Sequence, residues 1–126
     1  MLEVLEARRV SGFEDLDVWR RAFDISLVVH KKSLTFPHIE QYALGDQIRR
    51  ASKSICANIA EGFPKQRVSK LEFKRYLMMS LASANEMLTW VKFCKALEYI
   101  NDDEFKVWHE EYSSICKMLN ALHIRS

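Results

Sequence analysis

Residues 46–62, with the sequence DQIRRASKSICANIAEG, are the most informative part of this 126-residue chain. Coiled at about 3.6 residues per turn, they place four apolar residues on one side of a helix: Ile48, Ala51, Ile55 and Ile59. Three cations fall on the other side among small residues: Arg49, Arg50 and Lys53. We therefore predict a helix over residues 46–61 that packs in its own bundle and also lines a shared surface. Gly62 can close this helix with a left-handed cap.

The composition indicates a single globular domain made of helices. Hydrophobic residues make up 48% of the chain and charged residues 29%, which is typical of soluble globular proteins rather than disordered ones. The chain contains only 3 glycines and 2 prolines, and this scarcity favours long helices over short strands joined by tight turns. We expect residues 1–12 to form a flexible N-terminal arm and residues 13–126 to form a four-helix bundle domain.

The first helix should begin at Asp15 or Asp17, either of which can cap it, and run to about Ser33. Apolar residues at helical spacing predict its inward stripe: Leu16, Trp19, Phe23, Leu27 and, more marginally, His30. The pair Phe36-Pro37 ends this helix, because proline lacks an amide donor and restricts the residue before it.

A basic loop at residues 63–68 leads to a third helix over residues 70–97, where Ser69 and Glu72 have the spacing of a capping box. One apolar stripe of this helix contains Phe73, Leu77, Leu81, Ala84, Leu88 and Val91. A second contains Tyr76, Met79, Met87, Trp90, Phe93 and Leu97. Since a bundle helix needs only about three inward positions in seven, either some of this surface meets another subunit or the helix is more deeply buried.

A second capping box, Asn101 with Glu104, opens the fourth helix. Its apolar stripe contains Phe105, Trp108, Tyr112, Ile115, Cys116, Leu119 and Leu122. Short connections between long helices make neighbours antiparallel. The sequence therefore predicts an all-α fold, an antiparallel up-and-down four-helix bundle without an internal repeat.

No pattern of catalytic or metal-ligating residues stands out. The four histidines lack the one-turn spacing of a metal-binding pair, and the isolated glycines do not form a phosphate-binding loop. We expect no metal, no cofactor and no enzymatic activity, with an enzyme as the less favoured alternative. Three widely spaced cysteines read as small buried hydrophobes of a reducing compartment: Cys56, Cys94 and Cys116. Without a segment apolar enough for a secretion signal or membrane span, we expect a cytoplasmic protein with no membrane partner.

The net charge of +2 conceals an uneven distribution. Residues 49–75 contain eight basic and two acidic side chains, whereas residues 98–126 contain three basic and six acidic ones. The basic set is Arg49, Arg50, Lys53, Lys65, Arg67, Lys70, Lys74 and Arg75. This asymmetry can steer an anion to one side or pair one subunit with another, although ordinary solvated faces would have the same composition.

Glu61 lies in the last turn of the second helix, where the helix dipole disfavours a carboxylate. We expect Glu61 to pair with Arg49 or Arg50 of a neighbouring helix or subunit. The alternative is that Glu61 is simply solvated. Asn58 can tie down a neighbouring backbone or remain a plain surface amide. Together with residues of the third helix, these positions form the set that we assign to structure and assembly: Asn58, Glu61, Gly62, Tyr76, Met79 and Trp90.

Several motifs together resemble one known family. They are FEDLDVW at residues 13–19, Phe36-Pro37, QIRRA at 47–51, SICANIAEGF at 54–63, EFxxYL at 72–77 and LxYI at 97–100. They are similar to the four-helix-bundle proteins encoded in intervening sequences of bacterial 23S rRNA genes. The resemblance implies a left-handed bundle that assembles into a ring, expected to be a homopentamer, with no enzymatic activity. It also implies kinship with the accessory variability proteins of diversity-generating retroelements, which form basic barrels and bind nucleic acid.

Two residues depart from the family pattern. Cys56 stands where proline is usual, which restores a backbone donor and should leave the helix less kinked. Glu98 stands where glycine is usual, which makes a left-handed turn there costlier.

Our leading hypothesis is a non-enzymatic ring that binds RNA or DNA through backbone phosphates, using the eight basic residues. The alternative is a structural or protein-interaction module with no nucleic-acid role, whose basic residues bind the acidic residues 102–111 of a neighbour.

Overall fold

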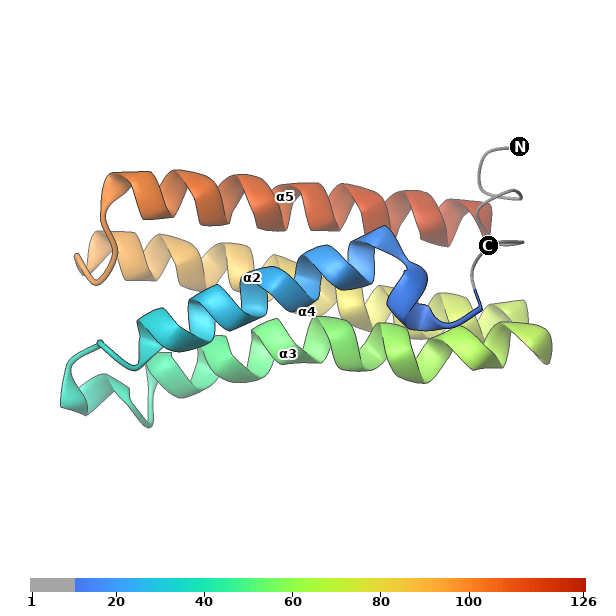
Figure 1. Cartoon of the computed structure of the whole chain (residues 1–126), viewed down its shortest axis with the longest axis horizontal. Helices are drawn as coiled ribbons and strands as arrows, with labels where there is room; N and C mark the ends of the chain where they lie inside the picture. The colour runs from blue at the N-terminus through green and yellow to red at the C-terminus, as the bar shows by residue number, and fades with distance from the viewer. Residues whose placement is uncertain (1–10) are drawn as a thin grey trace.

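The chain folds as four long helices with three short 3-10 turns in the computed structural model, which describes residues 11–126 (Figure 1). The long helices are α2 (Asp17–Ser33), α3 (Leu44–Gly62), α4 (Lys70–Ala96) and α5 (Asp102–Arg125). The 3-10 turns are η1 (Phe13–Asp15), η2 (His38–Glu40) and η3 (Phe63–Arg67). The described residues contain no strand, so the prediction of an all-α fold with four helices is confirmed. Most of the predicted arm, residues 1–10, lies outside the described residues.

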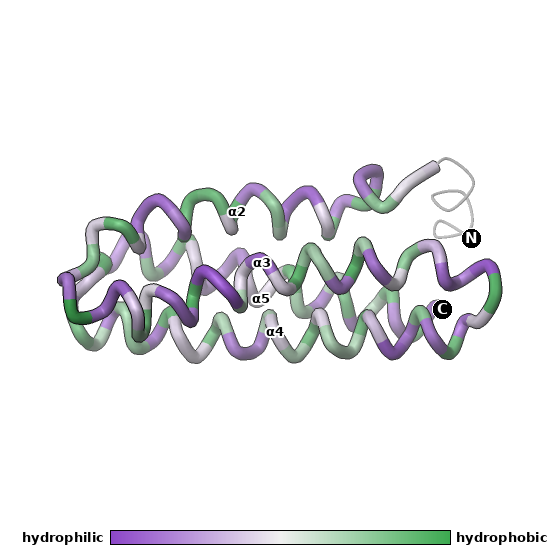
Figure 2. The backbone as a smooth tube through the Cα atoms, turned by 90° about the horizontal axis from the view of Figure 1, so that it is seen from below, coloured by the Kyte–Doolittle hydropathy of each residue, from purple (hydrophilic) through white to green (hydrophobic). Residues whose placement is uncertain are grey.

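The four helices pack lengthwise, with α2 and α4 at opposite edges and α3 and α5 between them (Figure 2). The connection between α2 and α3 meets the connection between α4 and α5 at one end, where the Tyr99 hydroxyl donates to Glu40 Oε2 at 2.8 Å. The connection between α3 and α4 lies at the other end, where Phe63 packs edge-on against Phe73 with ring centroids 6.3 Å apart. None of the helices in residues 11–126 has the length and apolar character of a membrane span.

Side chains close in sequence cap α4 and α5 as predicted. The Glu72 amide donates to Ser69 Oγ at 3.2 Å, although the Glu72 carboxylate pairs with Arg75 at 3.8 Å rather than completing the box. At α5 the box is complete, because the Glu104 amide donates to Asn101 Oδ1 and the Asn101 amide donates back to Glu104 Oε1. These local bonds satisfy amides that have no partner within the helix.

The turn after α4 keeps a left-handed residue although the chain has no glycine there. Glu98 has a φ of 63°, the one positive value of a non-glycine residue in the described part of the chain. The Tyr99 amide closes the turn by donating to the Cys94 carbonyl at 2.8 Å. The departure from the family pattern therefore leaves the turn geometry in place while adding backbone strain at Glu98.

The predicted inward stripe of α2 is wrong for Phe23 and Leu27, while Trp19 is partly buried against the core. The buried residues of this helix are Val18, Ala22, Ile25, Ser26, Val29 and Ser33. Of the predicted stripe only Leu16 is buried, whereas Phe23 is 42% exposed and Leu27 45% exposed. Short side chains let a helix lie close to its neighbours, and this packing selects the face with alanine and serine over the bulkier one.

The predicted left-handed cap at Gly62 is also wrong. Gly62 is the last residue of α3 and has a φ of −78°, which any residue adopts. A Cβ at this position would lie 2.4 Å from the Cβ of Tyr76 on α4. The glycine is needed because the two helices approach each other closely here.

All four long helices supply residues to the core. Of the predicted α5 stripe, four members are buried: Trp108, Tyr112, Ile115 and Leu119. The others, Phe105, Cys116 and Leu122, are partly buried against the core. On α4, Leu77, Met87 and Val91 are inaccessible, whereas Met79, Phe93 and Leu97 remain about half exposed. The predicted second stripe is thus divided, with Met87 in the core and the other members partly buried or exposed.

Candidate nucleic-acid interface

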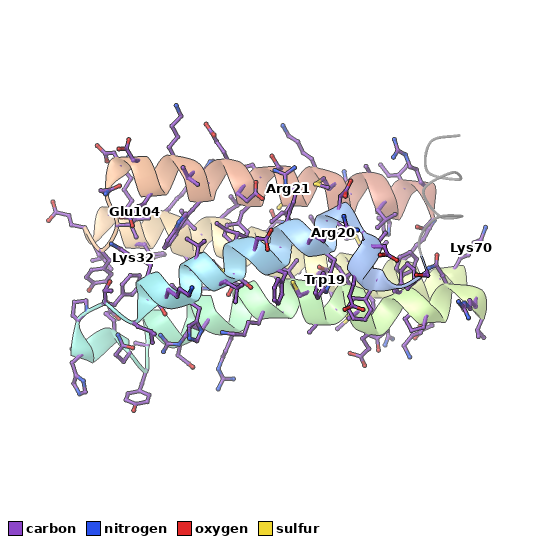
Figure 3. The ribbon with its side chains drawn as sticks, viewed as in Figure 1. Trp19, Arg20, Arg21, Lys32, Lys70 and Glu104 are labelled. Atoms are coloured by element: carbon purple, nitrogen blue, oxygen red, sulfur yellow. The ribbon has the colours of Figure 1, made fainter. Side chains whose placement is uncertain are left out.

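Five of the predicted basic residues meet at one end of the bundle. Lys65 and Arg67 belong to η3, while Lys70, Lys74 and Arg75 follow in the first two turns of α4. Figure 3 shows Lys70 extending into solvent at this end. Arg67, Lys70 and Arg75 are exposed, and Lys65 and Lys74 are half-buried. We call these five residues the basic tip.

Few carboxylates neutralise the basic tip. Within residues 11–126 its one ion pair joins Arg75 to Glu72 at 3.8 Å, and both side chains are exposed. Lys65, Arg67, Lys70 and Lys74 have no carboxylate within ion-pair distance in that part of the chain. The positive end of the α4 dipole lies in the same place and adds to the field. The basic tip can therefore attract an anion from outside the chain.

Tyr76 organises the inner edge of the basic tip. Lys65 Nζ lies 5.5 Å and Arg75 Cζ 5.9 Å from the centre of its ring. The Tyr76 hydroxyl donates to Glu61 Oε1 at 3.4 Å. The hydrogen-bond partner of Glu61 is therefore a phenol of the same chain. Our expectation that Arg49 or Arg50 pairs with Glu61 is wrong within this chain.

Arg49 is a structural residue rather than part of a free cationic strip. Its guanidinium donates to Ser33 Oγ at 2.8 Å and to the Gln41 carbonyl at 2.5 Å. The Gln41 amide in turn donates to the Ser33 and Phe36 carbonyls at 3.0 and 3.1 Å. Arg49 thus fastens the end of α2 and the following turn to α3. Its partners lie eight or more residues away in sequence, so no local pattern announces the contact.

The other two cations of the predicted strip on α3 remain exposed, and each contacts a side chain of the same chain. Arg50 pairs with Asp46 one helical turn earlier at 2.9 Å. Lys53 Nζ donates to His30 Nδ1 on α2 at 2.9 Å. Burial and the charges of Lys53 and Arg49 lower the pKa of His30, while burial and the charge of Arg49 lower the pKa of Lys53. The structure therefore divides the eight predicted basic residues between the basic tip and separate contacts along α3.

Four of the six residues assigned to structure and assembly lie along the seam between α3 and α4: Asn58, Glu61, Gly62 and Tyr76. Asn58 donates to the Ser54 carbonyl and to Ser54 Oγ of its own helix, at 2.9 and 3.0 Å, so it does not hold a neighbouring backbone. Ser83 Oγ on α4 extends this group by bonding Ser54 Oγ at 3.0 Å. Met79 is 45% exposed, and Trp90 is partly buried with an indole N–H that has no partner in residues 11–126.

Three of the five carboxylates in residues 102–111 are paired within the chain. Lys32 reaches Glu104 at 3.2 Å, the pair labelled at one end of Figure 3. Lys95 lies 3.7 Å from Asp102, and Arg21 donates two bonds to Glu111. These contacts join distant segments, and sequence reasoning missed them. They leave fewer free carboxylates for the basic residues of a neighbour.

Burial raises the pKa of all three cysteine thiols. Burial raises the pKa of the Cys56 and Cys94 thiols to about 12, so neither is a thiolate at neutral pH. Within residues 11–126, no three His, Cys, Asp or Glu side chains lie close enough together to hold a metal ion.

Comparisons with known proteins match this chain over nearly its whole length. Residues 14–121 match the sequence model of a family described as 23S rRNA-intervening sequence protein. Among solved structures, the chain is similar to a protein of unknown function from the S23 ribosomal protein family of Bacteroides thetaiotaomicron VPI-5482. The two are 24% identical with a TM-score of 0.73, over 84% of this chain and 97% of that one. This likeness supports the fold. No curated protein matches the chain.

Proposed function

Since the chain belongs to the 23S rRNA-intervening sequence protein family, we propose that it is a non-enzymatic, cytoplasmic helical bundle that binds RNA or DNA. Binding takes place at the basic tip and is directed at backbone phosphates. The observation that carries this proposal is the contrast between the two ends of the molecule. Four cations of the tip have no carboxylate partner in residues 11–126, whereas at the opposite end Asp102 is paired with Lys95 and Glu104 with Lys32.

The chemistry of the tip favours phosphate contacts over base recognition. Its side chains are lysines and arginines, and its one aromatic ring, Tyr76, lies between Lys65 and Arg75 instead of offering a free face for stacking. Such contacts fix a nucleic acid in place without reading its sequence. If all five cations contact phosphates of a duplex, log Kobs should fall with log salt with a slope of about −4.5.

The proposal includes self-association. In this proposal the four helices of each copy form an antiparallel, left-handed up-and-down bundle. The copies assemble into a ring, which the resemblance to the family indicates is a homopentamer. Linking several tips in one particle would raise the affinity for a long nucleic acid without any new contact. The half-exposed side chains of Met79, Phe93 and Leu97 support this part of the proposal.

Fluorescence anisotropy with a labelled RNA duplex at two salt concentrations tests the binding. The double variant Lys70→Gln, Lys74→Gln removes two tip charges and should weaken binding at low salt by at least tenfold. The matched control is Lys106→Gln, Lys117→Gln, which removes two exposed α5 charges that have no ion-pair partner in residues 11–126. No binding at low salt, an affinity independent of salt, or an equal loss in the control would contradict the proposal.

The alternative function is a structural or protein-interaction module without a nucleic-acid role. The exposed apolar side chains of α4 favour it, because they suit a protein partner better than a phosphate backbone. Charge reversal at Arg67 and Lys70 distinguishes the two. Loss of assembly with no change in nucleic-acid binding would favour the interaction module.

A further inference from the structure

Three basic side chains meet where α2 packs on α3, away from the basic tip. Lys53 on α3 has its Nζ 2.9 Å from Nδ1 of His30 on α2. Arg49, one turn before Lys53 on the same helix, contributes a positive charge that acts on both groups. We call His30, Arg49 and Lys53 the seam cluster. It belongs to the first half of α3, whereas the basic tip begins only after that helix has ended.

The seam cluster is bonded to neutral acceptors. The Arg49 guanidinium donates to Ser33 Oγ and to the Gln41 carbonyl. Lys53 donates to the imidazole and, at 3.4 Å, to the Arg49 carbonyl. None of the three basic groups makes an ion pair in the described part of the chain. Neutral acceptors satisfy N–H groups without cancelling their charge, so the cluster keeps a positive field that favours an anion.

Carboxylates on the neighbouring elements bond to other groups or lie on another side of their helix. Asp46, two turns before Lys53 on α3, pairs with Arg50 at 2.9 Å. Asp24 lies six positions before His30, which places it about a third of a turn around α2. Two acidic residues of η2 and α5 at the same end of the bundle bond to other side chains of the chain: Glu40 to Tyr99 and Glu104 to Lys32.

The bond between Lys53 and His30 requires a neutral imidazole. Nδ1 accepts from the ammonium group only while it carries no proton, and burial together with the two neighbouring cations lowers the pKa of His30. A proton on Nδ1 would leave two donors 2.9 Å apart. An anionic oxygen that accepts from both donors would resolve this conflict. Binding of such an anion and binding of the proton should therefore favour each other.

We propose that the seam cluster binds a phosphate group and takes up a proton at His30 as it does so. Lys53 and the protonated imidazole contact phosphate oxygens, while Arg49 stays bonded to the turn after α2 and supplies charge. A phosphate suits this place because one group offers several acceptor oxygens and more than one negative charge. Lys53 is exposed, and so is Ala57, which lies one turn further along α3 and ends in a methyl group. A phosphate can therefore approach from solvent.

NMR titration of the histidine side chains in the full chain tests the proposal, with sulfate as the first probe. Sulfate has the tetrahedral shape of phosphate and keeps one charge between pH 5.5 and 7.5, so any dependence on pH comes from the protein. At constant ionic strength, sulfate should raise the pKa of His30 and leave that of His38, an exposed residue, unchanged. By linkage, sulfate should bind about tenfold more tightly at pH 5.5 than at pH 7.5.

Three variants assign the response to the seam cluster. Lys53→Gln removes one contact and should abolish the effect of sulfate on the pKa of His30. His30→Gln should bind sulfate more weakly, with the same affinity at both pH values. Lys106→Gln, which removes an exposed α5 charge without an ion-pair partner in residues 11–126, is the matched control and should behave as the parent. Circular dichroism verifies the fold of each variant.

Three results would overturn the proposal. They are an unchanged pKa of His30 in sulfate, an equal shift of the pKa of His38, and a full response in Lys53→Gln. Because the first two are measured on the unmodified protein, the proposal can fail even if a variant does not fold.

Inorganic phosphate and an RNA duplex then distinguish two sources of the phosphate group. A response of His30 to inorganic phosphate alone supports a small phosphorylated ligand, and a response to the duplex as well supports backbone phosphates. The inference does not rest on the proposed function. Duplex binding without any sulfate response would contradict the seam cluster alone, whereas a sulfate response in a protein that binds no duplex would contradict the proposed function alone.

Discussion

The seam between α3 and α4 and the contact between α2 and α5 hold the same bundle together by different means. At the first, small residues bring the helices close, and the buried Ser80 Oγ donates across it to the Ile55 carbonyl at 2.8 Å. At the second, long charged side chains bridge the helices, with Arg21 bound to Glu111 and Lys32 to Glu104. Close packing tolerates no added atom, whereas bridging ion pairs respond to salt and pH. The difference indicates that α2 is the more adjustable helix.

The largest effect should come from adding one methyl group to the tight seam. Gly62→Ala places a Cβ 2.4 Å from the Cβ of Tyr76, and because both atoms are fixed to backbone the helices must separate. We expect a loss of about 3 kcal/mol in the free energy of unfolding, measured by urea denaturation. Gly12→Ala is the control, since a Cβ there meets nothing within 4 Å. Equal stability of both variants would show that the seam is not closely packed.

A smaller effect should follow from cutting the bridge between α2 and α5. Arg21→Gln removes a pair in which both side chains are partly exposed, so the cost should be about 0.5 kcal/mol at low salt and should shrink as salt rises. A double-mutant cycle with Glu111→Gln isolates the interaction. Lys106→Gln should change stability little at any salt concentration. A coupling energy that salt leaves unchanged would place this pair with the tight seam instead.

The smallest effect concerns pH on the other flank of α2. Burial and the cations Lys53 and Arg49 hold the pKa of His30 below its usual 6.5, so the folded state binds this proton less readily than the unfolded chain. Stability should therefore be complete above pH 6.5, decrease as pH falls through that value, and level off below the folded-state pKa. In His30→Gln, the urea concentration at the midpoint of unfolding should change less between pH 7.5 and 5.5 than it does in the parent protein. The His38→Gln profile should match the parent, and identical profiles for all three proteins would contradict the account.

Local patterns of residues were enough to predict the helices, whereas the errors in the predicted core and caps arise from contacts between distant segments. Ser69 and Asn101 find their capping partners three residues away, so both helix starts were predictable. On α2 two stripes overlap at helical spacing, and the bulkier one suggests the core. The face that is buried instead contains Ala22 and Ser33, because the distance between helices, which the sequence does not state, decides the packing.

The candidate site shows the same limit. The basic tip could be predicted because its residues lie close together in sequence, and its role in binding stays a prediction. Arg49 looked like part of a cationic face, yet its partner Ser33 lies 16 residues earlier and meets it only in the folded chain. Gly62 suggested a cap because it ends a helix, whereas its reason for being glycine lies on another helix in Tyr76.

The left-handed residue after α4 bears on how this protein can change over generations. With a φ of 63° at Glu98, the folded chain carries a steric cost of roughly 1–2 kcal/mol that glycine would not have. A single-nucleotide substitution converts a glutamate codon into a glycine codon. Glu98→Gly, a single mutational step away, would therefore add stability that offsets a destabilising substitution elsewhere in the bundle.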